Sequence, residues 1–408
     1  MKICVIGAGV VGCATAYHLC DLGHEVVLVD GKSSPGEGTS FANGGQLSYS
    51  YVEPLASPAT LRGLPAMLLD KNSPLRWRPT ADWAQWAWGL RFLAACNARQ
   101  LEQGTHQLLG IAALSQATLD DWMARDSLEF NFTRNGKLVL SPDEPTLKRQ
   151  GQQIALQAYA GVVQQLLDRE QCLAIEPALG NYPGFIGGVW TEGECAGDPY
   201  LFCHALVAAA KKRGLLCLFD TQVKGFLFRN GLATSIETGK GLVSADAFVL
   251  ATGVQAPVLA SQLGEHLPIY PIKGYSVTLP LRPNQAIPKV NVTDLSQKMV
   301  LAPLDGKLRV AAMAEFAGYG LEAAPHTIER ITRTVEKIYP GACEMAYPQA
   351  WAGLRPATPT SVPIIRRSRI ANVTLNVGHG ALGFTLAAGS AKLAAALVAE
   401  PDSLGNKS

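Results

Sequence analysis

The first thirty residues restrict the fold more than any other part of the chain. Residues 2–6 and 25–29 are apolar and predict two short buried strands. Between them, positions 7–12 have the pattern GxGxxG, and an apolar helix is expected to run from there to about residue 22. GxGxxG alone would be weak evidence. A strand, glycines, a helix and a second strand in this order indicate an α/β unit that binds a dinucleotide.

The glycines and the acidic residue of this unit each have a physical role. Gly7 permits the tight turn after the strand, Gly9 lets the backbone approach a pyrophosphate, and Gly12 lets helix and strand pack closely. The helix N-terminus supplies free N–H groups and a positive dipole end for the phosphates. Asp30 ends the second strand, where its carboxylate is placed to accept hydrogen bonds from a ribose and disfavours a 2′-phosphate.

The composition bounds the class of protein. At 408 residues, 48% hydrophobic and 17% charged, the chain is long enough for two globular domains. A formal net charge of +2 gives no reason to expect a nucleic acid partner. The nine cysteines include no CxxC pair, which suits reduced thiols in the cytoplasm and argues against a metal site. We expect no signal peptide, and a buried helix rather than a membrane span over 381–399.

Elements typical of nucleotide binding recur along the chain. A glycine-rich loop follows at 31–45, an apolar strand ends in Ala-Thr-Gly at 251–253, and a closing strand at 373–377 precedes Gly-His-Gly and the last helix. Alternating apolar and polar residues between 268 and 325 predict an antiparallel sheet. The predicted fold is α/β, a Rossmann-like cofactor domain with an inserted α+β substrate domain. We assign to the first domain residues 1–80, 145–265 and 346–408, and to the second residues 81–144 and 266–345.

Five segments carry a resemblance to a known family. Residues 10–12, 42–46, 270–276, 353–358 and 378–385 resemble segments of the FAD-dependent D-amino-acid oxidase superfamily, most closely those of the catalytic small subunit of bacterial D-amino acid dehydrogenases. The resemblance covers nearly the whole chain. It implies FAD as the cofactor and the oxidative deamination of D-amino acids to 2-oxo acids and ammonia. It also implies that the electrons pass to a quinone or another carrier. We expect FAD to be held noncovalently, because residues 353–358 include no cysteine.

The resemblance further implies which residues contact FAD. They belong to the first glycine turn, the end of the second strand, the glycine-rich loop, the middle strands and the closing Gly-His-Gly segment. They are Gly7, Gly9, Val10, Val11, Gly12, Asp30, Gly31, Lys32, Ser40, Asn43, Gly44, Gly45, Gln46, Val223, Thr252, Gly253, Gly353, His379, Gly380, Ala381, Leu382, Gly383, Phe384 and Thr385.

Arg355 is the first candidate for binding a substrate. It lies in an apolar turn bounded by proline, where an unpaired guanidinium would be costly to bury. A substrate carboxylate would satisfy it with two parallel hydrogen bonds, and the resemblance places this arginine over the flavin. Tyr275 and Tyr51 are candidates for shaping the substrate site, each with a hydroxyl for the substrate and a ring as an apolar wall.

His379 has two interpretations. Its imidazole would suit a general base that takes a proton from the substrate amine. The glycines on either side favour instead a close approach of the backbone to the flavin, with the following helix N-terminus stabilising negative charge on the reduced ring. We expect the backbone role.

A tryptophan-rich segment, residues 77–88, is the other unusual feature. It holds four of the seven tryptophans and is flanked by Arg62, Lys71, Arg76, Arg78 and Arg91. Aromatic residues with basic flanks suit a helix on an anionic membrane surface, which would make the protein peripheral on the inner face of the cytoplasmic membrane and close to a quinone. In the other interpretation Trp83 and Trp86 pack on the core and the arginines are solvated. Both stay open.

Two further functions stay open as well. The same fold would also suit the oxidation of glycine or of secondary amino acids such as D-proline, hydroxyproline or sarcosine. From another class, the chain would be one subunit of a hetero-oligomer, with a role in electron relay or assembly beside other subunits. An NAD-dependent dehydrogenase would share the opening motif, but the Gly-His-Gly helix and the discontinuous domain resemble FAD enzymes.

Overall fold

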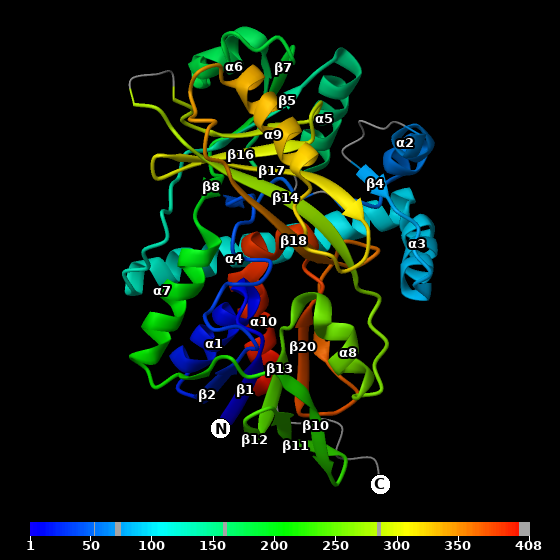
Figure 1. Ribbon diagram of the computed structural model, residues 1–408, viewed down its shortest axis with the longest axis vertical. Coiled ribbons are helices and arrows are strands. Elements are labelled where there is room, and N and C mark those ends of the chain that lie inside the picture. The colour runs from blue at the N-terminus through cyan, green and yellow to red at the C-terminus, as the bar shows by residue number, and fades with distance from the viewer. Residues whose placement is uncertain (53, 70–74, 158–160, 284–286, 400–408) are drawn as a thin grey trace.

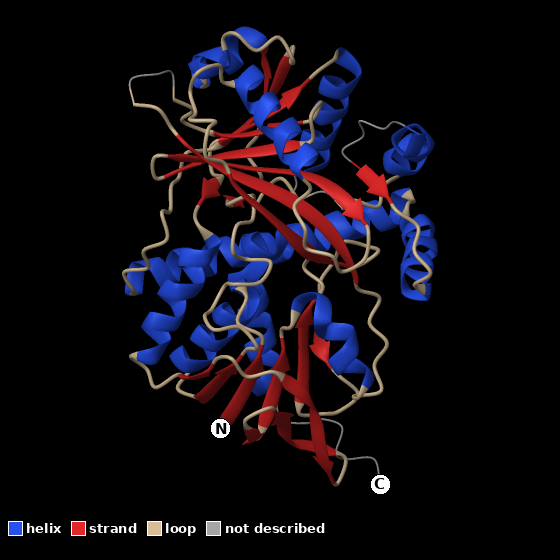
Figure 2. Ribbon diagram, in the orientation of Figure 1, coloured by secondary structure: helices blue, strands red, loops and turns tan. Residues whose placement is uncertain are grey.

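The computed structural model describes residues 1–52, 54–69, 75–157, 161–283 and 287–399. The chain forms two halves, each built on one large β-sheet (Figure 1). A band of helices crosses between the two sheets, with the long helix α4 (Ala98–Arg125) among them (Figure 2). We call the half that contains the first strand the nucleotide domain and the other half the sheet domain.

The nucleotide domain has a six-stranded sheet in the order β19-β20-β13-β1-β2-β9. All neighbouring strands are parallel except β19, which pairs antiparallel with β20 at one edge. Segments from the beginning, middle and end of the chain therefore lie side by side. The strands are β1 (Lys2–Ile6), β2 (Glu25–Val29), β9 (Leu216–Leu218), β13 (Ala247–Leu250), β19 (Ile364–Arg367) and β20 (Val373–Val377).

Both faces of this sheet are buried. Ile3 and Val5 of β1 point into a core shared with α1 (Val10–Asp21), α4, α7 (Pro199–Lys211) and α10 (Gly383–Ala399). Cys4 and Ile6 point the other way, as the two-residue period of a strand requires. The second core also contains α8 (Ala256–Ser261) and an antiparallel sheet of β10 (Val223–Arg229), β11 (Leu232–Thr238) and β12 (Gly241–Ser244). Coverage on both faces explains why the strands are apolar throughout.

The sheet domain has a nine-stranded, mostly antiparallel sheet. Its order is β18-β14-β17-β16-β15-β5-β7-β6, and β4 pairs with β17. The strands are β4 (Leu75–Trp77), β5 (Lys137–Ser141), β6 (Gln165–Asp168), β7 (Gly187–Thr191), β14 (Tyr270–Pro280), β15 (Asn291–Asp294), β16 (Met299–Leu304), β17 (Lys307–Phe316) and β18 (Gln349–Ala357).

One face of the nine-stranded sheet packs under helices. The helix α9 (Pro325–Ile338) buries Ile328, Ile331 and Val335 against it. The same half holds α5 (Glu144–Gln157), α6 (Arg169–Ile175) and the short 3₁₀ helix η2 (Pro177–Leu179) (Figure 1). The opposite face of β14 and β18 meets loop 39–46 of the nucleotide domain. The remaining elements are α2 (Pro58–Leu69), α3 (Trp83–Ala95), β3 (Gln46–Leu47), β8 (Cys195–Ala196), η3 (Gly253–Gln255) and η4 (Gly380–Leu382).

The fold class agrees with the prediction, but the expected domain ranges need correction. Strands β6 and β7, within the range assigned to the cofactor domain, join the nine-stranded sheet because β7 pairs with β5. Strand β18 is an edge of the same sheet. Helix α4, assigned to the substrate domain, instead packs in the core of the nucleotide domain. These differences arise from strand pairings between distant segments, which the local periodicity of the sequence does not predict.

The C-terminal helix lies in the core. Residues Gly380–Ala399 form, within the described chain, the one helix that is long and apolar enough to cross a membrane. Of its apolar window 56% is buried, and α10 packs with α1 and α4. This position agrees with the buried helix expected from the sequence.

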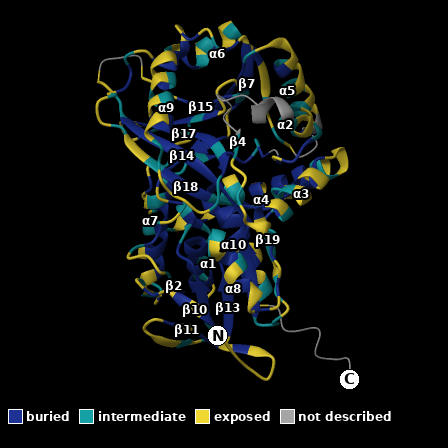
Figure 3. Ribbon diagram, turned by 45° about the vertical axis from the view of Figure 1, so that its right-hand side comes forward, coloured by how far each residue is buried: buried dark blue, intermediate teal, exposed yellow. Residues whose placement is uncertain are grey.

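The tryptophan-rich segment divides between core and surface. Trp88 is buried against Phe92 and Tyr270, and its indole nitrogen donates to the carbonyl oxygen of Ala357 at 2.8 Å. Trp83 is 74% exposed and Trp86 45% exposed. The interpretation that both pack on the core is therefore wrong for Trp83, whereas Trp86 is half-exposed and contacts the partly buried Trp77 edge to face. Figure 3 shows the exposed residues along α3.

Candidate active site

The glycine turn after β1 is shaped by close backbone contacts. Gly7 has a φ of 104°, and a Cβ there would lie 2.5 Å from the carbonyl oxygen of Ala251 at the end of β13. A Cβ on Gly12 would lie 1.7 Å from the Gly7 carbonyl oxygen. Gly9 has room, because a Cβ there would lie 3.4 Å from its nearest neighbour, Ser40 Oγ. Packing therefore requires Gly7 and Gly12, whereas Gly9 leaves the turn open toward a ligand.

Asp30 organises the edge of this turn. Its carboxylate accepts hydrogen bonds from the backbone N–H groups of Ala8 at 2.6 Å and Lys32 at 2.8 Å. The N–H of Thr221 donates to the Asp30 carbonyl oxygen at 2.9 Å, just before β10 begins at Val223. The structure thus brings Asp30, Gly31, Lys32 and Val223 to one edge, as a ribose and base site would need. Their contacts with a nucleotide stay a prediction.

Two helices begin next to each other at this turn. The first N–H of α1, on Val10, donates to Ser40 Oγ at 3.0 Å. A Cβ on Gly383, the first residue of α10, would lie 3.9 Å from Val10 Cγ2, so the two N-termini are neighbours. Thr385 Oγ1, in the first turn of α10, accepts a hydrogen bond from the N–H of Ser48. Two positive dipole ends therefore converge where phosphates and a reduced ring system would carry negative charge.

Thr252 and Gly253 lie at the end of β13, beside Gly7. Gly253 has a φ of 56°, a backbone conformation that favours glycine. Thr252 Oγ1 is buried and has no hydrogen-bond partner among the described residues. A buried hydroxyl without a partner next to the glycine turn is a place where a ligand atom would complete a hydrogen bond.

The glycine-rich loop is clamped onto the nine-stranded sheet. Thr39 Oγ1 donates to the carbonyl oxygen of Leu354 on β18 at 2.7 Å, and Ser276 Oγ on β14 donates to that of Ala42 at 2.6 Å. Gln46 Nε2 donates to two carbonyl oxygens of β15 and β16. Loop 39–46, which we call the clamped loop, therefore lies between the two domains. Side chains of the loop and of the sheet both form the hydrogen bonds that hold it there.

The glycine pair in this loop has a packing role. A Cβ on Gly44 would lie 3.3 Å from Ala311 Cβ, and a Cβ on Gly45 would lie 2.9 Å from Leu304 Cδ1. Asn43 Oδ1 accepts from the N–H of Gly45 and closes the turn. The resemblance implies that the pair contacts FAD, and the structure shows that it also allows the close approach of the loop to β16 and β17.

Arg355 lies in strand β18 and not in the turn expected from the sequence, because residues 349–357 pair with β14. It carries a positive charge without a carboxylate partner among the described residues. Its guanidinium folds over Gly274, where a Cβ would lie 2.4 Å from Arg355 Nη2. Nη1 donates to the carbonyl oxygen of Met313 at 2.9 Å. Burial lowers the pKa of Arg355 to about 10, which still leaves it charged at neutral pH. A ligand carboxylate would compensate this desolvation.

Met313 holds the acceptor for Arg355 in a strained backbone position. Its φ is 67°, uncommon for a residue other than glycine, and it lies where the pairing of β14 with β17 is irregular. The irregularity turns the Met313 carbonyl toward the guanidinium. Trp351 lies on the same face of β18 as Arg355 and folds over Gly353, where a Cβ would lie 2.0 Å from its ring. The sequence did not lead us to Met313 or Trp351. Trp351 could have been found, because it lies four residues before Arg355 on one strand and therefore on the same face.

Tyr275 lies on the opposite face of the sheet from Arg355. Ile272 is paired with Arg355, and the two-residue period of β14 turns Tyr275 to the other side. Its hydroxyl donates to Glu315, and Lys273 Nζ lies 5.3 Å from its ring centroid. Glu315 in turn pairs with Arg78 at 2.6 Å. The structure therefore does not bring Tyr275 to Arg355, and the expected role of Tyr275 in the substrate site is corrected to one in the buried core.

Tyr51 lies beside a buried lysine. Lys137 Nζ is 4.6 Å from the Tyr51 ring centroid and donates to Ser48 Oγ at 2.8 Å. Burial lowers the pKa of Lys137 to about 8. Glu194, also buried, accepts from the N–H of Ser50 at 2.7 Å, and its burial raises its pKa. Two buried charges of opposite sign thus hold the segment 48–51, which continues from the clamped loop. Sequence reasoning did not single out either charge.

His379 is buried behind the edge of β18. It forms an isolated bridge with Ala357, and Gly378 and Gly380 on either side have φ values of 80° and 56°. Its Nε2 has no hydrogen-bond partner within the described chain. Burial lowers the pKa of His379 to about 3, so the ring is neutral at working pH. A neutral ring with that pKa is a poor proton acceptor, which favours the backbone role over base catalysis.

A comparison with known protein families identifies the family of this chain. The model of the DAO family, described as FAD dependent oxidoreductase, matches residues 2–397. The chain belongs to this family. It is an FAD-dependent oxidoreductase.

The similarity to individual relatives extends over the whole chain. The chain is 40% identical to D-amino acid dehydrogenase 2 of Ralstonia nicotianae, over 98% of this chain and 96% of the relative. It is 35% identical to D-amino acid dehydrogenase of Granulibacter bethesdensis, with coverage of 98% and 96%.

Solved structures show the same fold. Glycine oxidase from Bacillus cereus superposes with a TM-score of 0.76 and 20% identity, covering 97% of this chain and 94% of that one. L-proline dehydrogenase from P. horikoshii gives 0.71 and 21%, covering 98% and 93%. The parallel sheet with an inserted antiparallel domain is therefore the architecture of this FAD-dependent family.

The residues present fit FAD. The open turn at Gly9, the carboxylate of Asp30 and the N-terminus of α1 suit its adenosine and pyrophosphate. The segment 378–385 and the clamped loop suit the flavin ring, which would then lie between the start of α10 and the face of the sheet that carries Arg355. These residues would hold FAD, and the assignment of each contact stays a prediction.

We predict that Gly9→Val yields a folded protein without flavin. A Cβ at this position has room in the protein, and the added side chain is expected to enter the path of the pyrophosphate. Gly12→Val is expected instead to lower the melting temperature, because its Cβ would collide with the Gly7 carbonyl. Circular dichroism and the visible flavin band of the purified variants distinguish the two outcomes. A normal flavin spectrum in Gly9→Val would contradict this placement of the cofactor.

Proposed function

We propose that this enzyme oxidises D-amino acids to 2-oxo acids and ammonia and passes the electrons to a quinone or another carrier. The names of its relatives at 35–40% identity support the substrate class. The single observation that supports an amino acid substrate most directly is the Arg355 guanidinium, which has no carboxylate partner among the described residues.

The site positions its substrate through a few interactions. Arg355 binds the carboxylate with two parallel hydrogen bonds, and the Met313 carbonyl and the surface of Gly274 hold the guanidinium in place. Trp351 walls the same face of the sheet. Positioning and exclusion of water do most of the work in such a reaction, so the site needs few acid–base groups.

Bound FAD supplies the acceptor for the hydride that leaves the substrate α-carbon. The neutral substrate amine needs no strong protein base, which is consistent with the low pKa of His379. The N-terminus of α10 provides positive potential beside the segment 378–383. Water then hydrolyses the imino acid to the 2-oxo acid and ammonia.

The exposed face of α3 supports contact with a membrane. Trp83, Trp86, Leu90 and Leu93 recur at helical spacing, and all are 41% exposed or more. Arg91 on the same helix and Arg62 on α2 are exposed as well, while Lys71 lies outside the described residues. An apolar helix face with basic neighbours suits the interface of an anionic bilayer. We infer that the protein binds peripherally there and reaches its electron acceptor in the membrane.

We predict that Arg355→Met retains FAD but lowers kcat/KM for D-amino acids roughly a hundredfold, because a charged hydrogen bond pair worth about 3 kcal/mol is lost. Steady-state kinetics gives kcat/KM and KM, and anaerobic bleaching of the visible flavin band by a panel of D-, L- and imino acids shows which compounds reduce the flavin. Arg229→Met, at an exposed arginine on β10, is the matched control. An unchanged KM in Arg355→Met would remove Arg355 from the site.

The same panel tests the reaction itself. Bleaching by many D-amino acids supports the proposal. Bleaching only by proline-like or N-methyl compounds would overturn it in favour of secondary amines. A flavin that no amino acid bleaches would point to an electron-relay subunit.

We predict that His379→Gln keeps the rising limb of the plot of log kcat/KM against pH. Burial lowers the histidine pKa, so the ring is already neutral throughout that range and the limb belongs to the substrate amine. Steady-state kinetics between pH 6 and pH 10, roughly the range that brackets a free α-amine, checks this at equal flavin content. Disappearance of the limb, with a rate loss of about a hundredfold or more, would identify His379 as the base.

We predict that the double variant Trp83→Ala, Trp86→Ala binds vesicles rich in phosphatidylglycerol at least about tenfold more weakly than the unmodified protein, since it loses most of the aromatic area on α3. Co-sedimentation at low and high salt measures the binding. Tyr347→Ala, at a tyrosine that is 76% exposed elsewhere, is the control. Equal sedimentation of the double variant and the unmodified protein would exclude this face.

A further inference from the structure

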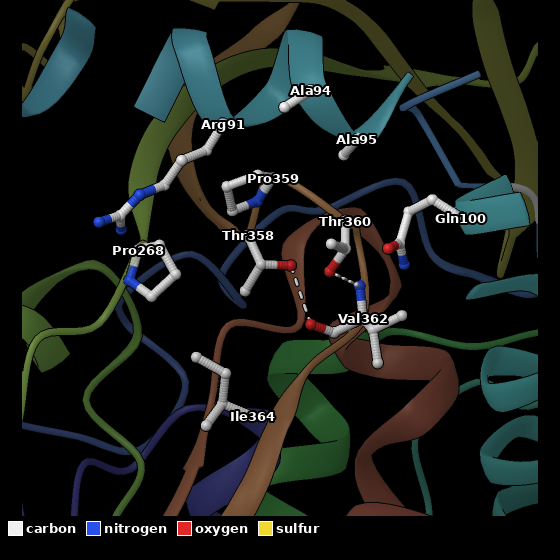
Figure 4. A pocket seen from close by; sticks show the side chains of 10 residues that line it. All are labelled: Arg91, Ala94, Ala95, Gln100, Pro268, Thr358, Pro359, Thr360, Val362 and Ile364. Carbon is white, nitrogen blue, oxygen red and sulfur yellow. Dashed lines mark hydrogen bonds between the residues drawn. The ribbon is translucent and has the colours of Figure 1, made fainter. Parts of the chain in front are cut away.

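A cavity of about 370 Å³ lies between α3 and the segment that follows β18 (Figure 4). Arg91, Ala94 and Ala95 of α3 line one side of it, and residues of 358–364 line the other. Gln100, near the start of α4, completes the lining. The contacts assigned above to the substrate and the flavin do not use this cavity.

The wall between the cavity and the predicted flavin segment is thin. Thr358 lines the cavity, and its Cγ2 is 2.7 Å from the place of a Cβ on Gly378. The preceding residue, Ala357, forms the bridge with His379. The backbone of 378–380 therefore contacts the residues of the cavity wall on the side that faces away from the cavity. A ligand in this cavity would lie close to the flavin ring predicted beside 378–380.

The lining suits a flat apolar ring with polar atoms at two ends. Proline, valine, isoleucine and alanine side chains supply most of the surface. In Figure 4 the guanidinium of Arg91 and the amide of Gln100 lie at opposite sides of the set of lining residues, with Thr360 between them. Arg91 forms no ion pair within the described chain. Hydrogen-bond donors at two ends of an apolar slot match a ring that carries a carbonyl oxygen at each end.

The cavity lies beside the helix face proposed to meet the membrane. Leu90 and Leu93, exposed on that face, alternate along α3 with the lining residues Arg91 and Ala94. A ligand dissolved in the bilayer would therefore reach the cavity along α3 without crossing water.

We propose that this cavity binds the head group of a lipid-soluble quinone, the acceptor of the electrons from FAD. This inference rests on the proposed function, which supplies the reduced flavin. In the transfer the reduced flavin loses two electrons and one proton, water supplies a second proton, and two O–H bonds form on the quinone oxygens to give the quinol. Arg91 and Gln100 donate to those oxygens.

The test separates the two half-reactions. FAD in the purified holoenzyme is reduced with dithionite, so that the experiment does not depend on the amino acid substrate, and is mixed in detergent with a short-chain ubiquinone analogue. Stopped-flow absorbance follows the return of the oxidised flavin band, and equilibrium dialysis measures binding of the quinone independently of turnover. Detergent removes the membrane, so that contact of α3 with a bilayer is not tested.

Two variants address the cavity. Ala94→Phe fills it from α3, and Gln100→Leu removes one donor. We expect Ala94→Phe to lower both quinone binding and reoxidation by quinone at least tenfold, and Gln100→Leu to lower them several-fold. Reoxidation by ferricenium, a small water-soluble acceptor, is expected to stay unchanged. Ala113→Phe, at an exposed alanine of α4, is the matched control.

Two outcomes would overturn the proposal. One is quinone reoxidation and binding in Ala94→Phe equal to those of the control. The other is an equal loss with quinone and with ferricenium, since that would mean general damage at the flavin. Failure of D-amino acids to bleach the flavin would leave these results standing and would contradict only the proposed substrate.

Discussion

The charge of Arg355 is the interaction on which the proposed active site depends. Its guanidinium is partly withdrawn from bulk water, which lowers its pKa, and no carboxylate of the described chain compensates it. The Met313 carbonyl and the flat surface of Gly274 hold the group in one position. Since a desolvated cation is costly until an anion meets it, the site has a built-in preference for a ligand carboxylate.

The clamped loop 39–46 brings this charge to the cofactor site. Hydroxyls of Thr39 and Ser276 donate to backbone carbonyls across the domain boundary, so the nucleotide domain is fastened to the same sheet face that carries Arg355. Neither domain forms the site alone. One contributes the glycine turn and two helix N-termini, and the other contributes the carboxylate binder. A shift of either sheet would separate a bound carboxylate from the flavin ring.

Electron entry and exit are proposed at different sides of the 378–380 segment. The substrate would lie on the face of the nine-stranded sheet beneath Arg355. The acceptor would lie behind the bridge between Ala357 and His379, next to the exposed face of α3. Such a separation would allow an amino acid from water and a quinone from the membrane to use one flavin without competing for one cavity.

The sequence by itself determined the nucleotide-binding unit and singled out Arg355 as the candidate for binding a carboxylate. The turn from Gly7 to Gly12 and Asp30 form a local structure whose order along the chain is also its order in space. A charged residue in an apolar segment is likewise visible in the sequence, although the expected turn there is the strand β18. Only the tertiary structure decided the domain boundaries, the irregular pairing at Met313 and the placement of Tyr275, whose hydroxyl bonds Glu315, 40 residues away. The physical reason is that strand register decides which side chains share a face, and register is set by pairing between distant segments, which local sequence patterns do not specify.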